Sequence, residues 1–276
     1  MSPPLPEFSH PPVYEMALSA QFTPLSDMHV AHLGLLWQDF RTLYPTTEEH
    51  PPVESALEQF DVTQAEPAPQ IQLVTTLPFP RVWYLNDDGS ELIQVQQDRI
   101  IRNWRQVEGS EIYPRYDHLI EVFEREIDMF NTFVEREHLG VVVPTQYEIT
   151  YINHITNDHI KNPHGNLDKI ITLWSGNYSL PFELEPENAR FAIRYGLRNN
   201  LGEKIGRLYI SVDPAVRISD GEVIVQMTLT VRGKAEGQDF RSMRQFMDFA
   251  HDAIVRGFAA ITTPTMHEVW GRLDAH

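Results

Sequence analysis

One order of predicted elements occurs twice along the chain: a strand, a helix, a three-stranded meander and a long helix. The first set covers residues 13–22, 28–44, 82–104 and 116–138, and the second covers residues 147–155, 166–174, 190–232 and 240–261. A strand that alternates apolar and polar residues needs cover on one face, which an amphipathic helix can supply. We therefore predict an α+β fold of two β-α-β-β-β-α repeats, with antiparallel sheets each covered by a long helix in a saddle-like or helix-grip-like arrangement.

The long helices give the clearest periodic pattern. Apolar residues recur at helical spacing along residues 116–138 and 240–261, while most charged residues fall outside the stripe. The stripes are predicted to bury Phe123, Ile127, Phe130, Met247, Ile254 and Phe258 against sheet. In the helix at 28–44, the same reasoning predicts a buried stripe that includes Leu35, Leu36, Phe40 and Leu43.

Proline marks the irregular parts of the chain. Thirteen of the twenty prolines lie in the first 80 residues, where they disfavour helices and central strands. We predict an extended N-terminal arm at 1–12, a first α+β repeat at 13–145 with a Pro-rich connector at 45–80, and a second α+β repeat at 146–276. Within the connector, the spacing of Val53, Leu57 and Phe60 indicates a short packed helix.

Charge and cysteine content restrict the possible partners. The net charge is −17, and residues 1–68 hold ten acids and the single base Arg41. This acidity disfavours nucleic acid and anionic membranes and would attract a protein with a basic surface. There is no cysteine, which excludes thiolate metal sites and disulfides. With no signal-like or membrane-spanning run, we expect a cytoplasmic protein, whereas the oligomeric state is open.

A polar and aromatic patch is the first candidate site. Asn103, Trp104 and Arg105 end the first meander, and Asn153 and His154 end the strand that opens the second repeat. If these strand ends are neighbours, their side chains could hold a ligand or a partner residue. In the alternative, Asn153 and His154 bond to loop backbone while Trp104 closes the core.

A metal site is the second candidate. His154, Asp158 and His159 offer nitrogen and oxygen donors. Their spacing matches no metal motif, and Asn-Pro interrupts the segment that follows. The unmatched spacing and the interruption therefore lead us to predict no metal site.

An arginine-lined sheet face is the third candidate. Arginines alternate along one predicted strand and recur on its neighbours, at Arg190, Arg194, Arg198, Arg207 and Arg232. Such a face could bind an anion, but in so acidic a chain we expect the arginines to pair with acidic neighbours.

Catalytic and cofactor motifs are missing from the sequence. It has no G-x-S-x-G elbow, no phosphate-binding G-x-x-x-x-G-K-[ST] loop and no G-x-G-x-x-G after a strand. We therefore predict no catalytic residues and no cofactor.

Several short segments together resemble a known family. They are Pro11-Pro-Val-Tyr-Glu, Asn103-Trp-Arg, Tyr113-Pro-Arg-Tyr, Tyr151-Ile-Asn-His-Ile and Phe249-Ala-His-Asp-Ala-Ile-Val. In this order they resemble a sporadically distributed bacterial family of conserved hypothetical proteins of about this length. The resemblance implies no catalytic residue, and the family's patchy distribution would suit an accessory or defence locus.

Three functions follow as hypotheses. The first is a non-enzymatic interaction or regulatory protein, immunity-like or antitoxin-like, whose acidic surface meets a basic partner. The second is a small-molecule binder with an apolar cavity between sheet and helix. The third is a metal-dependent hydrolase that uses His154, Asp158 and His159.

Overall fold

The fold is α+β and is built on one large antiparallel sheet. The computed structural model describes residues 4–55, 57–60, 78–107, 112–174 and 187–273. The strands of the sheet are β2 (Val13–Phe22), β3 (Thr46–His50), β4 (Arg81–Leu85), β5 (Glu91–Gln96), β6 (Arg99–Arg105), β7 (Pro144–Ile155), β8 (Phe191–Arg198), β9 (Lys204–Val216) and β10 (Val223–Gly233). The helices are α1 (Val30–Phe40), α2 (Arg115–Arg136), α3 (Leu167–Ile170), α4 (Phe240–Ile261) and α5 (Pro264–Val269), with a 3-10 turn at Pro163–Gly165.

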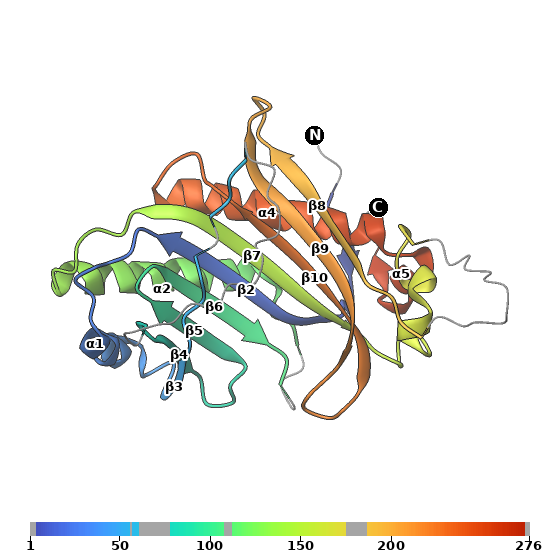
Figure 1. The fold of residues 1–276 in the computed structure, drawn as a ribbon, viewed down its shortest axis with the longest axis horizontal. Helices are drawn as coiled ribbons and strands as arrows, with labels where there is room; N and C mark the ends of the chain where they lie inside the picture. Colours follow the sequence, from blue (N-terminus) through green and yellow to red (C-terminus); the bar gives the residue numbers. More distant parts are fainter. Residues whose placement is uncertain (1–3, 56, 61–77, 108–111, 175–186, 274–276) are drawn as a thin grey trace.

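The strand order is β3-β4-β5-β6-β2-β7-β10-β9-β8. The first strands of the two predicted units, β2 and β7, pair at the centre, with Leu18 opposite Ile149. The first meander lies on one side of this pair and the second meander on the other. The sequence leaves open whether the two sets of strands merge, and the structure joins them in a single nine-stranded sheet. Figure 1 shows α2 and α4 behind this sheet, so both long helices cover the same face.

The predicted helical stripes form the core. Phe123, Ile127 and Phe130 of α2 are buried, as are Met247, Ile254 and Phe258 of α4, with none more than 7% exposed. Alternate side chains of a strand point to the same face of a sheet. On β7 and β10, the side chains that point toward the helices are buried. The buried-face prediction is confirmed for both long helices.

The predictions for the first helix and the connector need correction. Helix α1 ends at Phe40 and buries Leu33, Leu36 and Phe40, whereas Leu35 and Leu43 are exposed. The predicted stripe was placed partly on the wrong side of the helix, since a short helix with apolar residues on several faces does not fix its own orientation.

In the connector, residues 46–50 form the edge strand β3. No helix occurs in its described part after β3, residues 51–55, 57–60 and 78–80. The packed helix predicted from Val53, Leu57 and Phe60 is therefore wrong.

A buried ion cluster fixes α2 to the sheet. The guanidinium of Arg102 on β6 binds the carboxylate of Glu126 on α2, and the two side chains are 1% and 2% exposed. Arg102 also donates to the hydroxyl of Tyr44 and to the carboxylate of Glu91, both at 2.5 Å. Buried charges persist in a core when each is paired and hydrogen-bonded.

No helix among the described residues has the length and apolar character needed to cross a membrane.

Removing part of the buried stripe of α2 should destabilise the fold. Ile127→Ala deletes buried methyl and methylene groups and leaves a cavity, so the free energy of unfolding should fall by ~2–5 kcal/mol. Urea denaturation would measure the change. Val141→Ala, at a position that is 76% exposed, is the control and should change stability by less than ~0.5 kcal/mol. Equal effects of the two substitutions would contradict the assigned core.

Candidate functional site

The N-terminal arm is fixed against the C-terminal part of the chain. Strand β1 (Glu7–Phe8) pairs with β11 (Arg272–Leu273), and the backbone N–H groups of Ser9 and His10 donate to the carbonyls of Gly271 and Trp270, each at 3.0 Å. The ring of Phe8 meets that of Phe258 edge-on, with centroids 5.5 Å apart. The arm is thus held over the end of α4.

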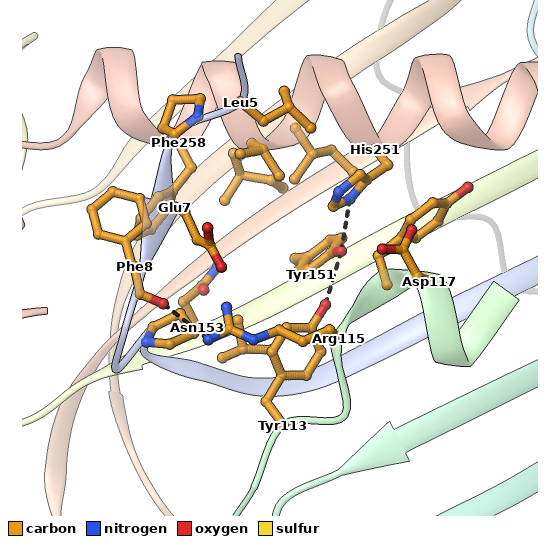
Figure 2. Close-up of a pocket in the computed structure, with 17 residues that line it drawn as sticks. Leu5, Glu7, Phe8, Tyr113, Arg115, Asp117, Tyr151, Asn153, His251 and Phe258 are labelled. Atoms are coloured by element: carbon orange, nitrogen blue, oxygen red, sulfur yellow. Dashed lines mark hydrogen bonds between the residues drawn. The ribbon is translucent and has the colours of Figure 1, made fainter. Parts of the chain in front are cut away.

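A pocket lies between this arm, helix α4 and the sheet. Its volume is about 340 Å³. Much of its wall is apolar, including Leu5, Pro6 and Phe8 of the arm, Leu229 of β10, and Ile254 and Phe258 of α4. We call this cavity the arm pocket (Figure 2). A concave apolar site with a few polar groups is the usual form of a small-molecule site.

A chain of hydrogen bonds forms the polar end of the arm pocket. The hydroxyl of Tyr151 on β7 lies 3.0 Å from the hydroxyl of Tyr113 and 2.9 Å from Nδ1 of His251 on α4. Figure 2 shows this chain running from the helix through the sheet residue to the segment before α2. The ring of Tyr116 stacks on His251 with centroids 4.0 Å apart, and its hydroxyl donates to Asp248 at 2.7 Å.

The three members of this chain are neutral near pH 7. Burial lowers the pKa of His251 from 6.5 to about 4. Burial also raises the pKa of Tyr113 and that of Tyr151, the latter with an added contribution from Tyr113 itself. Efficient proton transfer requires a pKa near the working pH, and none of these groups has one. The chain is therefore suited to hydrogen bonding and poorly suited to acid–base catalysis at neutral pH.

Arg115 brings a charge to the same end of the pocket. Its backbone has φ of 69°, a left-handed conformation that is uncommon outside glycine. The guanidinium donates to the carbonyl oxygen of Phe8 at 3.0 Å and lies 5.8 Å from the centroid of the Tyr113 ring. Because an arginine has five N–H donors, it retains donors for a ligand beside this bond. Glu7 and Asp117 also line the pocket.

The sequence-predicted patch is divided by the sheet. Strands β6 and β7 each pair with β2, so their ends are separated by one strand. Strand alternation places Trp104 and Asn153 toward the helices, and Asn103, Arg105 and His154 toward the opposite face. Trp104 and His154 nevertheless line a common cavity beside the arm, whereas Asn103, Arg105 and Asn153 do not line it.

Most members of the patch have structural partners. Asn103 bonds to Gln94 and Glu15, Arg105 donates to the carbonyl of Gly89, and Asn153 donates to the carbonyl of Met227. Asn153 also lines the arm pocket. Of the two residues in the alternative, Asn153 bonds a backbone atom, which lies on strand β10, whereas Nδ1 of His154 is buried without a hydrogen-bond partner among the described residues.

His154 lies in a second cavity, on the other side of the arm. Its ring stacks on Tyr14 with centroids 3.8 Å apart, and its pKa is lowered to about 4, chiefly by burial and then by the charge of Arg217. His154, Asp158 and His159 all line this cavity. Among the described residues, however, no three His, Asp or Glu side chains are grouped closely enough to hold a metal ion. The metal-ligand hypothesis has no geometric support there.

Sequence reasoning missed the tyrosine and histidine chain. Tyr113, Tyr151 and His251 all lie in the segments that carry the family resemblance, but none of the three was assigned to a site. One usable signal was the position of His251, four residues after the buried Met247 and so beside the helical stripe. The convergence itself depends on three separate elements, which periodicity does not bring together.

Comparison with known proteins does not add to this picture. No protein-family model, curated protein or solved structure matches the chain.

The lowered pKa of His251 should make stability depend on pH. Between about 4 and 6.5 the unfolded chain binds more protons at this residue than the folded chain. The free energy of unfolding should therefore decrease as pH falls through this range. His251→Gln should weaken the dependence, measured by urea denaturation at a series of pH values. His154 should retain its own contribution in this variant, because its pKa is also lowered.

The matched control is His118→Gln, at an exposed position of α2. It should leave the pH dependence as in the wild type. An unchanged slope in the His251 variant would show that this histidine is not desolvated in solution.

Proposed function

We propose that the protein is a non-catalytic binding protein whose arm pocket takes a small, mainly apolar molecule with one hydrogen-bonding group. The observation that carries this proposal is the neutral Tyr113–Tyr151–His251 chain at one end of a cavity whose wall, apart from the charged Glu7, Arg115 and Asp117, is largely apolar. The volume of about 340 Å³ is near the lower end of the range of small-molecule sites, ~300–1,000 Å³. The apolar wall would supply affinity, and the hydroxyl groups would orient the ligand.

The position of the polar chain explains why orientation would be specific. Tyr151 is buried in β7, and its hydroxyl is held from both sides by Tyr113 and His251. A ligand that buried an apolar group against these oxygens would leave polar atoms without partners, which costs about 1–3 kcal/mol per group. A ligand with a matching donor or acceptor avoids that cost.

Filling the pocket should abolish binding. The fluorescent probe N-phenyl-1-naphthylamine combines a phenyl and a naphthyl group with one N–H group and can be titrated directly. Val255 lines the arm pocket on α4, so Val255→Trp should weaken probe binding about tenfold or more by occupying the ligand's volume.

Val141→Trp is the matched control, because Val141 is an exposed residue remote from the pocket lining. It should bind the probe as the wild type does. Equal binding by both variants would contradict the assignment of the arm pocket as the site.

We also propose that the two halves of the chain are structural duplicates that curve into a saddle. The proposal is supported by the strand order, in which β6, β5 and β4 follow outward from β2 as β10, β9 and β8 follow outward from β7. Superposition of residues 13–138 on 147–261 would contradict it if the meanders and long helices failed to align in the same order.

The acidic surface supports a second candidate function, recruitment of a basic protein partner. Glu48 and Glu49 are exposed on β3, which is the last strand on one side of the sheet in the part of the chain that the structure describes. Glu54 is exposed as well, whereas Glu58 is only 6% exposed and belongs to a different surface. Open edge strands are available for contact with another chain.

Charge reversal on β3 tests this second candidate. A basic protein captured from the native host should associate about tenfold more slowly with the Glu48→Lys/Glu49→Lys variant than with the wild type, because steering by opposite charge is lost. The equivalent reversal Glu121→Lys/Asp128→Lys, on the exposed side of α2, is the control. Equal slowing by both pairs would indicate a general charge effect and not a binding surface.

A further inference from the structure

A short part of the connector crosses the polar face of the sheet. This crossing segment consists of residues 53–55 and 57–60. In Figure 1 the light-blue chain that follows β3 runs across the face turned toward the viewer, opposite the face covered by α2 and α4. Its contacts fall in the same order as the strands: first β5 and β6, then β2 and β7, and finally β9.

Side chains of the sheet bind the backbone of the crossing segment at several points along its length. Gln96 on β5 accepts from the N–H of Val53 and donates to its carbonyl, both at 3.0 Å. Arg99 on β6 donates to the carbonyl of Glu54 at 3.4 Å. Gln146 on β7 accepts from the N–H of Glu58 at 2.8 Å. Bonds to backbone atoms hold an extended chain without requiring particular side chains, as in known modes of peptide recognition.

Arg207 on β9 completes this series of backbone contacts by donating to the carbonyl of Gln59 at 2.8 Å. Its guanidinium also lies 5.2 Å from the centroid of the Phe60 ring. The sheet residues that make these contacts come from strands that are distant in sequence. The face therefore holds the segment along its length and not at a single point.

Two side chains of the segment are bound as well. The hydroxyl of Ser55 accepts from Gln21 on β2 and donates to Asp98 at 2.6 Å. The carboxylate of Glu58 accepts from the hydroxyl of Tyr209 and from the guanidinium of Arg207, and its side chain is 2% exposed. The guanidinium of Arg232 lies 3.9 Å from the same carboxylate. A buried carboxylate that meets two arginines and a tyrosine is an anionic anchor in a basic pocket.

The polar face extends beyond the crossing segment. A cavity of about 500 Å³ is lined by Arg194, Tyr209, Ser211, Thr228, Thr230 and Arg232. The guanidinium groups of Arg194 and Arg232 each lie within 6 Å of the Tyr209 ring centroid, at 5.6 and 5.8 Å. This cavity shares Tyr209 and Arg232 with the anchor of Glu58, so the two sites are continuous. Their arginines, Arg194, Arg207 and Arg232, are accompanied by the carboxylate of Glu58 and by that of Glu148 on β7, which pairs with Arg232.

We propose that this polar face is a binding groove for an extended acidic peptide segment of a partner protein, and that the crossing segment is its resident intramolecular occupant. A partner segment would use the same backbone contacts, place a glutamate at the anchor of Glu58 and extend into the cavity beyond Tyr209. The charge of the groove selects an acidic segment, in contrast to the basic partner expected from the net charge. This inference concerns the face opposite the arm pocket and is independent of the ligand proposed there.

A labelled synthetic peptide with the sequence of residues 51–60 tests the proposal. In the full-length Glu58→Lys variant, the internal segment would place a cation against Arg207 and Arg232 and leave the groove. Fluorescence anisotropy should then show the peptide binding at least about tenfold more tightly to this variant than to the wild type, where the tethered segment competes. Glu54→Lys changes an exposed acid of the same segment, and it should behave as the wild type.

The contact at Glu58 is also tested by a change in the peptide. A peptide that carries Gln in place of Glu58 should bind the Glu58→Lys protein about tenfold more weakly, because a charge-assisted bond is lost. If circular dichroism shows that Glu58→Lys does not fold, Glu58→Gln, which retains the size of the side chain, replaces it. Absence of peptide binding to a folded variant would overturn the proposal. A wild-type dimer that the peptide dissociates would also overturn it, by assigning the groove to the same segment of a second copy.

Discussion

The antiparallel pairing of β2 with β7 is the contact on which the rest of the structure depends. It joins strands that begin the two halves of the chain and so makes one sheet from two meanders. Because side chains alternate along each strand, the register of this pair decides which residues face the long helices and which face away. It directs Ile149 and Tyr151 toward α4 and Gln146 toward the crossing segment.

The two faces of the sheet consequently have different chemistry. The helix-covered face is largely apolar, with Arg102 and Glu126 neutralising each other inside it. At its edge, the Tyr113–Tyr151–His251 chain supplies polar atoms without net charge. The opposite face carries glutamines and arginines that bind chain segments through hydrogen bonds. A small apolar ligand suits the first environment and an extended acidic peptide suits the second.

Much of the fold could be predicted from periodicity. The α4 bounds and the six buried residues of the long helices follow from local patterns that the tertiary structure does not override. The site could not be predicted in the same way. Trp104 and Asn153 stand next to Arg105 and His154 in the sequence, yet alternation sends neighbours to opposite faces. Tyr113, Tyr151 and His251 are far apart in the sequence and meet only because α4 packs across β7.

The sequence by itself determined the α+β class, the order of strands and long helices, and the side of each long helix that is buried, because these depend on the spacing of apolar residues within a segment. Only the tertiary structure decided where the irregular, proline-rich segments pack and which residues they contact. The arm closes a pocket through β1 and β11, and Glu58, one acid among many in the sequence, is buried against Arg207 and Tyr209. Such contacts depend on hydrogen bonds between residues distant in sequence, and no local pattern encodes them.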